Sequence, residues 1–469
     1  MSTSYDVRIW SIETITGKRG TTYRVRWVVG RNAPIPRTFS TKRLAESFRS
    51  DLISAARKGE AFDIESGLPQ SMMPKATSPT WLTFAMDHMD VKWADFSPNT
   101  RKSTADGLTT ITIAMVKGDD TPPDDALLRK ALRTWAFNSL ARVKNPEPPE
   151  EYREVIAWIA KRSRPVEDLN DTATTRRVLK AISLKLDGSP AAAKTANRKR
   201  AAFSSAIGYA LELGFLESNP LQRVKVKRAP TAEELDARVV VNHRQAKRLL
   251  AAVHASDPEF EAFIGCIYYA AMRPAEVRNL SELDLTLPAE GWGEARLAGS
   301  YQDPGRDWTD DGTLGEERGL KHRARNSVRP TPLPPPLVKL LSRHLEKFGT
   351  GPDGRLFVVR AGKWGHALPA SLSRPVPLSA VGRVMKNARA AAFTEEEQNS
   401  PLARRAYDLR HAAVSTWLAA GTPAPLVAKW AGHSVQVLLT VYAHAVDGQE
   451  DAARKRIEQA LTDDGGIEG

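Results

Sequence analysis

Two linker-like stretches divide this chain into three parts, and this division constrains its fold more than any other feature. The first stretch, residues 61–78, contains Gly67, Pro69 and Pro74, and the second, residues 223–230, reads Arg-Val-Lys-Val-Lys-Arg-Ala-Pro. Proline, glycine and runs of like charge interrupt helices and strands, so such stretches are typical of linkers. A chain of 469 residues is also longer than a single hydrophobic core usually serves. The sequence therefore predicts a multidomain protein.

The first part has the pattern of a small β-sheet followed by one helix. Apolar and basic residues alternate in the segment Tyr-Arg-Val-Arg-Trp-Val-Val at positions 23–29, which predicts a half-buried strand with a basic face. Turn residues on both sides of this segment predict a sheet of three strands, and Ser40 or Thr41 can cap the following helix. Arg24 and Arg26 either contact a nucleic acid or are simply solvated, and the local pattern leaves both interpretations open.

The second part lacks strand alternation and is predicted to be all-α. We expect helices near residues 80–93, 99–115, 124–143, 150–162, 171–186 and 191–213. The last of these helices begins with a basic cluster that contains Arg198, Lys199 and Arg200. Because the backbone amides at a helix start also attract anions, this cluster is a candidate phosphate contact.

The third part is predicted to be mixed but mainly helical. We expect helices near residues 243–254, 258–271, 274–280, 335–347, 379–392, 407–420, 424–430 and 434–443. Strands are expected near residues 294–298, 314–320 and 327–333, with the last two paired as a hairpin around residues 322–326. Cys266 is the only cysteine, so an intrachain disulfide and a cluster of thiolate metal ligands are both excluded. It lies in an apolar run of ten residues, which predicts a buried helix that is too short to cross a bilayer.

Positive charge is concentrated in particular segments, and this favours a polyanionic partner. The chain carries a net charge of +13. Residues 1–60 have a net charge of +7 and residues 191–230 one of +6, whereas the tail 447–469 has a net charge of −4. Clustered charge of this kind indicates nucleic-acid binding better than general solubility does. The start of the chain lacks the apolar core of a signal peptide, so we expect a cytoplasmic protein.

Five short words in the third part carry residues suited to phosphate chemistry. They are Met272-Arg-Pro-Ala-Glu276, Lys321 ahead of Arg329-Pro-Thr-Pro332, Tyr407-Asp-Leu-Arg-His411, Ala431-Gly-His433 and Tyr442-Ala-His444. Two arginines can clamp one phosphate without a metal ion, a lysine can protonate a leaving oxygen, and a tyrosine can form a covalent phosphate ester.

The ordered set resembles the catalytic domain of the tyrosine recombinases, the phage-integrase family, and most closely the integrases of actinobacterial phages and integrative elements. The resemblance is strong only after residue 241 and loose over residues 1–62. It implies three DNA-binding parts and these boundaries: 1–62 an arm-type-like domain, 63–79 a linker, 80–225 a helical core-binding domain, 226–240 a basic linker, 241–446 the α+β catalytic domain and 447–469 a tail.

The resemblance also implies roles for single residues. Arg273, Arg410 and His433 hold the scissile phosphate, Glu276 braces Arg273, Lys321 protonates the departing 5′ oxygen and Tyr442 is the nucleophile. The DNA-binding candidates are Arg24, Arg26, Arg198, Lys199, Arg200, Lys225, Lys227, Arg323 and Arg325. No cofactor is implied. The implied partners are double-stranded DNA attachment sites, three further copies of the chain in a tetramer, and an excision or directionality factor.

The chain departs from the family pattern at Tyr407, where a histidine is usual. A phenol is a poor base at neutral pH, so we expect Tyr407 to orient the phosphate or Tyr442 by a hydrogen bond, or only to pack. His411 and His444 are expected to be structural. Two other functions remain open: a type IB topoisomerase that relaxes supercoils, and a catalytically inactive DNA-binding regulator in which Tyr407 marks the loss of activity.

Overall fold

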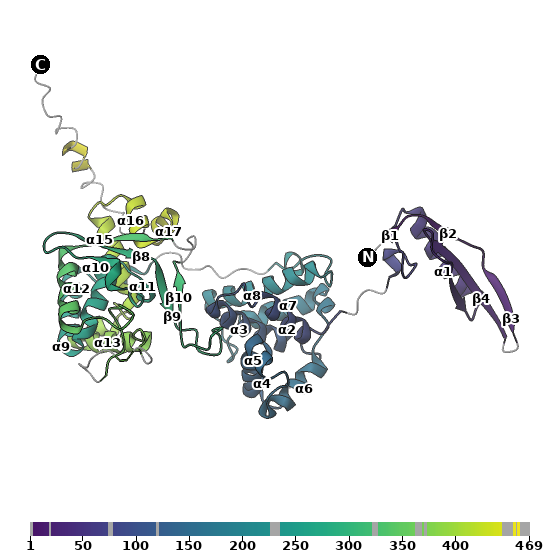
Figure 1. Ribbon diagram of the computed structural model, residues 1–469, viewed down its shortest axis with the longest axis horizontal. Coiled ribbons are helices and arrows are strands. Elements are labelled where there is room, and N and C mark those ends of the chain that lie inside the picture. The colour runs from purple at the N-terminus through teal and green to yellow at the C-terminus, as the bar shows by residue number, and fades with distance from the viewer. Residues whose placement is uncertain are drawn as a thin grey trace, which may run out of the picture.

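The chain folds into helix-rich bodies with small sheets, and Figure 1 shows the computed structural model. The structure describes residues 3–17, 20–73, 78–118, 122–225, 235–320, 327–361, 368–369, 373–442, 454–455 and 457–459. Within these residues, no helix is both long enough and apolar enough to span a bilayer. The expected multidomain, mainly helical fold with a small amino-terminal sheet is confirmed.

The amino-terminal body is a four-stranded sheet covered by one helix, and its first and last strands pair as a separate two-stranded sheet. Its strands are β1 (Thr3–Ser4), β2 (Val7–Ile9), β3 (Glu13–Gly17), β4 (Gly20–Val29), β5 (Ile35–Phe39) and β6 (Phe62–Asp63), and its helices are α1 (Lys42–Arg57) and the 3₁₀ turn η1 (Gln70–Met72). The central strand β4 pairs antiparallel with β2, β3 and β5. The expectation of three strands was therefore one short, because the first strand is interrupted and pairs with β4 in two pieces. Thr41 caps α1, as one of the two expected candidates.

The alternation in β4 places its apolar side chains in the core. Val25, Trp27 and Val29 are buried against α1, while Arg24 and Arg26 lie on the other face, each near the carboxylate of Glu13. The basic face is thus partly exposed and partly neutralised.

The second body is a bundle of helices. Its elements are α2 (Trp81–Lys92), α3 (Pro98–Ala114), α4 (Asp125–Ala131), the π-helical turn η2 (Leu132–Ala136), α5 (Ser139–Lys144), η3 (Glu150–Tyr152), α6 (Arg153–Arg162), η4 (Val166–Asn170), α7 (Thr172–Ile182), α8 (Ala193–Glu212) and η5 (Pro220–Gln222). The single helix expected over residues 124–143 was wrong. The chain leaves the helix after η2, and Asn138 starts α5 anew because its side chain caps the amide of Ala141.

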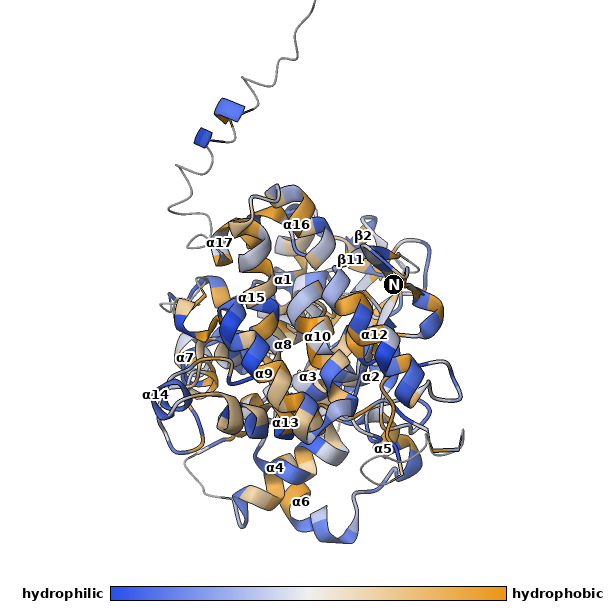
Figure 2. Cartoon of the chain, turned by 90° about the vertical axis from the view of Figure 1, so that its left-hand side faces the viewer, coloured by the Kyte–Doolittle hydropathy of each residue, from blue (hydrophilic) through white to orange (hydrophobic). Residues whose placement is uncertain are grey.

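The third body contains a helical core flanked by a short sheet. Its helices are η6 (Ala237–Val239), α9 (His243–Ser256), η7 (Pro258–Phe260), α10 (Glu261–Ala270), α11 (Pro274–Val277), η8 (Glu282–Asp284), α12 (Pro335–Phe348), α13 (Leu378–Ala392), α14 (Glu395–Asn399), α15 (Ala406–Ala419), α16 (Ala424–Ala431) and α17 (Val435–Val441). Its strands are β7 (Leu285–Thr286), β8 (Gly293–Leu297), β9 (Gly299–Gln302), β10 (Glu316–Gly319) and β11 (Arg329–Leu333). Figure 2 shows hydrophobic colour along α10 and α13 and hydrophilic colour on α14. The centre of this core is α10, on which Cys266 is fully buried.

The strand pairing expected at residues 314–333 was wrong. Strand β10 pairs with β9, and β11 pairs with β8, so β10 and β11 extend along one ribbon rather than forming a hairpin with each other. The loop that turns this ribbon back is residues 303–315, between β9 and β10. The residues between β10 and β11 that were expected at a hairpin tip, Lys321 to Asn326, lie outside the described residues.

This loop, which we call the strap (residues 303–315), joins the second and third bodies. Figure 1 shows β9 and β10 reaching from the third body toward α3. Trp308 enters the hydrophobic cluster of the helical bundle and stacks on Trp93, with ring centroids 6.1 Å apart. Arg101 on α3 is buried beside it and donates to the backbone oxygen of Trp308 at 3.0 Å and to both carboxylate oxygens of Asp310 at 2.7 and 3.1 Å. The two bodies therefore share a packed contact as well as a linker.

We predict that Trp308→Ala lowers the free energy of unfolding by about 3–5 kcal/mol, the usual cost of removing a buried tryptophan. Trp292→Ala is the matched control, because Trp292 lies in the same body but is 62% exposed. It should change the free energy of unfolding by less than about 0.5 kcal/mol. Urea unfolding followed by circular dichroism measures both. Equal effects of the two substitutions would contradict the packing role of Trp308.

Candidate functional site

The side chains singled out in the third body converge where several helices end. Helix α10 ends at Ala270, and the next residue, Ala271, adopts the left-handed conformation with φ of 49°. A left-handed backbone is unfavourable for a residue with a Cβ atom, so it is maintained by the surrounding structure. Helix α16 ends in the same way at Gly432, with φ of 68°. These two turns direct backbone oxygens and the side chains of Arg273 and His433 toward one point.

Arg410, on α15, lies at the centre of this point and is fully buried. Its guanidinium donates to the backbone oxygen of Ala271, to that of Ala431 at 2.5 Å and to Nε2 of His433 at 2.7 Å. Burial, and next the nearby Arg273, lower the pKa of Arg410 to about 10, so it stays positively charged at neutral pH. Its Nε group is buried and has no partner among the described residues. A buried N–H without an acceptor is costly, and an anion at this point would satisfy it.

Arg273 reaches the same region from the start of α11. One of its terminal nitrogens donates to Glu276 at 2.7 Å and the other to the backbone oxygen of Gly432 at 2.7 Å. The side chain is 22% exposed, so Arg273 forms the solvent side of the site while Arg410 forms its floor.

Glu276 binds a second arginine that the sequence interpretation did not assign to the site. Arg329, on β11, donates to both carboxylate oxygens of Glu276 at 3.0 and 2.7 Å, and both side chains are almost fully buried. Burial alone would raise the pKa of Glu276, but Arg329, and then Arg273 and Arg410, lower it to about 2. In the sequence, Arg329 begins the motif Arg-Pro-Thr-Pro, and it was expected only as part of the strand near residues 327–333. Its side chain faces inward only because β11 pairs with β8.

His433 and Tyr442 close the site from the carboxyl-terminal helices. The ring of His433 stacks on that of Tyr442, with centroids 6.0 Å apart and an angle of 24° between the planes. Burial, followed by Arg410 and Arg273, lowers the pKa of His433 to about 3, so it is neutral at pH 7. Its Nε2 atom accepts from Arg410, so the ring proton is on Nδ1. Tyr442, at the end of α17, is fully buried, and burial raises the pKa of its hydroxyl although Arg410 opposes the shift.

The residue that contacts the Tyr442 hydroxyl is His411, which was expected to be structural. Its Nδ1 atom lies 2.8 Å from the hydroxyl oxygen. Tyr407 contacts the same imidazole, edge to face, with centroids 5.2 Å apart. The Arg410 guanidinium lies 5.9 Å from the Tyr407 ring centroid. Among the described residues no hydrogen bond of Tyr407 is found, and the hydrogen bond of the Tyr442 hydroxyl is made with His411. A role of Tyr407 in orienting a phosphate stays a prediction. The sequence contained one signal for this contact, because His411 directly follows Arg410. Consecutive residues on a helix are rotated by about 100°, so both side chains can face the same site.

The candidates for DNA contact fall in three places. Arg24 and Arg26 are on the amino-terminal sheet, Arg198, Lys199 and Arg200 are on the first turns of α8, and Lys225 is exposed at the end of the second body. Lys321, Arg323, Arg325 and Lys227 lie outside the described residues, as does His444.

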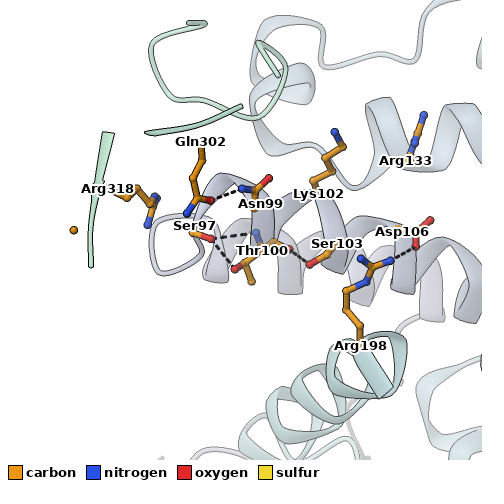
Figure 3. Close-up of a pocket in the computed structure, with 11 residues that line it drawn as sticks. Ser97, Asn99, Thr100, Lys102, Ser103, Asp106, Arg133, Arg198, Gln302 and Arg318 are labelled. Carbon is orange, nitrogen blue, oxygen red and sulfur yellow. Dashed lines mark hydrogen bonds and ion pairs between the residues drawn. The ribbon is translucent and has the colours of Figure 1, made fainter. Parts of the chain in front are cut away.

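A groove of about 880 Å³ runs between the second and third bodies beside the strap. Figure 3 shows its lining, which comes from α3, η2, α8, β9 and β10. Four of the lining side chains are cationic, namely Lys102, Arg133, Arg198 and Arg318. Asp106 is the acidic side chain of the lining and lies 3.7 Å from Arg198. Only Arg198 of these cations was selected from the sequence, because the others are scattered along the chain: Lys102 and Arg133 meet Arg198 through helix packing in the second body, and Arg318 joins them through the strap contact.

Comparisons with known proteins give likenesses of structure. No protein-family model and no curated protein matches the sequence. The chain is similar to the solved structure of the Tn1549 transposon integrase in complex with transposon right end DNA, with 15% identity over 81% of this chain and 99% of that chain and a TM-score of 0.47. It is similar to the XerH site-specific recombinase bound to difH substrate, with 13% identity over 83% of this chain and 97% of that chain and a TM-score of 0.44. It is also similar to a lambda integrase tetramer bound to a Holliday junction, with 9% identity over 88% of this chain and 92% of that chain and a TM-score of 0.41. At these identities and TM-scores, the likenesses by themselves say nothing about the chemistry of this chain.

We predict that acid removes a large part of the stability that Glu276 contributes. The pKa of Glu276 is about 2 in the folded chain against an ordinary value of 4.5. A depressed folded pKa stabilises the protein above pH 4.5, and this contribution, about 3 kcal/mol, is lost as pH falls from 4.5 toward 2.

The variant Glu276→Gln should be less stable by about 3–5 kcal/mol at pH 7, because it leaves buried arginines without a counter-charge. It should also show a weaker dependence of stability on pH below 4.5. Urea titrations at a series of pH values measure this, with Glu282→Gln, an exposed glutamate, as control. Identical pH dependence in wild type and Glu276→Gln would contradict the prediction.

Proposed function

We propose that this chain is a site-specific DNA recombinase of the tyrosine type, which cleaves and rejoins DNA through a 3′-phosphotyrosyl intermediate. The observation that carries the proposal is the convergence of Arg273, Arg410, His433 and Tyr442 on one buried point. These residues come from four separate segments of the sequence. A tyrosine that only packs in a hydrophobic core does not need two arginines beside it, whereas a tyrosine that forms a phosphate ester does.

The charges around the point fit a phosphodiester in its transition state. Arg273, Arg410 and Arg329 are cationic, Glu276 is anionic and His433 is neutral, which leaves two positive charges without a counter-charge. A phosphodiester carries one negative charge, and its nonbridging oxygens gain more during attack at phosphorus. Fixed cations in a water-poor site stabilise that developing charge most. The unpartnered Nε–H of Arg410 is a donor available to a nonbridging oxygen.

The chemical steps follow from this arrangement. The Tyr442 hydroxyl gives up its proton to a base as its oxygen attacks the phosphorus, a tyrosyl O–P bond forms, and the bond from phosphorus to the 5′ oxygen breaks. The 5′ oxygen takes a proton, for which we propose Lys321 as donor. Attack by a 5′ hydroxyl on the phosphotyrosine reverses the steps and reseals the strand. The phosphotyrosine ester conserves the energy of the phosphodiester bond, so neither cleavage nor resealing needs ATP.

The remaining parts of the chain are proposed to bind the DNA duplex. Residues 80–225 act as the core-binding domain and residues 241–446 as the catalytic domain, with the cationic groove beside the strap following the phosphate backbone. Residues 1–62 bind arm-type sites. Four copies act together on two DNA sites, and an excision factor sets the direction in which a mobile element is moved.

We predict that Tyr442→Phe abolishes a covalent protein–DNA adduct while leaving DNA affinity within about twofold of wild type. The substrates are duplexes from the DNA flanking the encoding gene, nicked close to the cleavage point so that the cut strand diffuses away. Denaturing gels detect the adduct, and an electrophoretic mobility shift measures binding. Tyr5→Phe is the control, because Tyr5 is 74% exposed. No adduct with wild-type protein on any such duplex would favour the inactive regulator. Relaxation of supercoils without joining of two sites would favour the topoisomerase.

We also predict that Arg133→Ala and Arg318→Ala weaken binding to all duplexes alike. Each contact to a phosphate contributes about 0.9 to the slope of log affinity against log salt concentration, so each substitution should lower the magnitude of that slope by about 1. Arg129→Ala is the control. Arg129 is on α4, about one helical turn before Arg133, pairs with Asp125 and does not line the groove. Unchanged slopes for both groove variants would contradict the assignment of this groove to DNA.

A further inference from the structure

His411 is the only described residue whose side chain hydrogen-bonds the hydroxyl of Tyr442, and its Nδ1 atom lies 2.8 Å from that oxygen. His433 also lies against Tyr442, but it does so through its ring face, and its Nε2 atom is taken by Arg410. Tyr407 contacts the imidazole of His411 and not the hydroxyl. One histidine is thus positioned on the Tyr442 oxygen, and it is not at position 407, where the family resemblance would place a histidine.

The surroundings keep both partners of this hydrogen bond uncharged at neutral pH. Burial raises the pKa of the Tyr442 hydroxyl, so it carries its proton at neutral pH. Burial is also the main reason that the pKa of His411 is lowered to about 4; Asp408 raises it, and Arg410, Arg405 and Lys194 lower it. The imidazole is therefore neutral, and it can accept a proton from the hydroxyl in the tautomer that carries its ring proton on Nε2 and leaves Nδ1 free as an acceptor.

We propose that His411 is the proton acceptor for Tyr442 in strand cleavage and the donor in resealing. The proposal rests on the proposed function, since it assigns a role within the same reaction. During attack the tyrosyl O–H bond breaks, the proton moves to Nδ1, and the oxygen forms its bond to phosphorus. The imidazole becomes an imidazolium with protons on both nitrogens. In the reverse direction the imidazolium returns the proton as the tyrosyl O–P bond breaks.

The groups that face His411 favour this role once DNA is bound. The cations near it, Arg410, Arg405 and Lys194, oppose an imidazolium in the free chain. A phosphodiester bound to Arg410 brings a negative charge into the same space, which favours the protonated form. Asp408, one turn earlier on α15, acts in the same direction. The base is weak in the free chain and gains strength when the substrate arrives, which protects Tyr442 from ionising without DNA.

The test is the pH dependence of adduct formation on the nicked duplex under single-turnover conditions, with wild type, His411→Asn and His411→Ala. Asparagine retains an acceptor oxygen close to the position of Nδ1 but cannot take a proton near neutral pH. We expect His411→Asn to slow cleavage by about 10²–10⁴-fold, with DNA affinity unchanged. We also expect its rate to rise about tenfold per pH unit between pH 6 and 9, because hydroxide must then remove the proton, whereas the wild-type rate is nearly level. His254→Asn, a half-exposed histidine on α9, is the matched control and should behave as wild type.

A second measurement separates proton transfer from positioning. A ring-fluorinated tyrosine at position 442 has a more acidic phenol and needs a base less, so it should restore His411→Asn cleavage by a larger factor than it changes the wild-type rate. If His411 only positions Tyr442, His411→Asn will retain the wild-type pH profile and fluorination will not rescue it, and the proposal is then wrong. If wild type itself forms no adduct, the proposed function fails, and the role of His411 fails with it. If wild type cleaves and only the His411 results disagree, the proposed function stands without this residue as its base.

Discussion

The buried carboxylate of Glu276 is the interaction on which the candidate site depends. It binds the guanidinium of Arg329 through both oxygens, and it accepts from the guanidinium of Arg273 through Oε1 and from the Arg273 backbone amide through Oε2. Arg410 is close enough to lower its pKa. Three guanidinium groups could not gather in a water-poor site without a counter-charge, because the cost of desolvation and mutual repulsion would exceed the gain from burial. One carboxylate reduces that cost but leaves net positive charge. The same residue therefore makes the site foldable and leaves it prepared for an anion.

Two features describe the state of the site without DNA. Tyr442 is fully buried, with its ring on His433 and its hydroxyl on His411. Arg410 is bonded to backbone oxygens at turns whose left-handed geometry is set by Ala271 and Gly432. These groups are thus held in place by the folded chain, and for the proposed reaction such an arrangement would lower the reorganisation needed. The strap also packs Trp308 into the helical bundle, so the groove between the bodies and the candidate site belong to one connected structure.

Local patterns predicted most elements well. The alternation of β4, the cap of α1 and the apolar run of α10 each depend on neighbours in the sequence, and each lies where expected. Failures occurred where a distant contact decides the conformation. The helix expected over residues 124–143 is interrupted at Asn138, whose side chain donates to the backbone of Asp307 in the strap. The strand pairing expected over residues 314–333 failed for the same reason. Strand β10 pairs with β9 and strand β11 with β8, and the two do not pair with each other.

The sequence by itself determined the chemical inventory: the arginines at 273 and 410, the histidine at 433, the tyrosine at 442 and the positive charge of particular segments. These are properties of residue type and spacing, which a chain carries whether or not it is folded. Only the tertiary structure decided which of these groups meet. It brought Arg329 to Glu276 through the pairing of β11 with β8, and it placed His411 rather than Tyr407 on the Tyr442 hydroxyl. It also brought Lys102 and Arg133 together by helix packing and added Arg318 to the same groove through the strap contact. The physical reason is that hydrogen bonds and ion pairs act over a few ångströms, so their partners are fixed by packing between segments far apart in the chain.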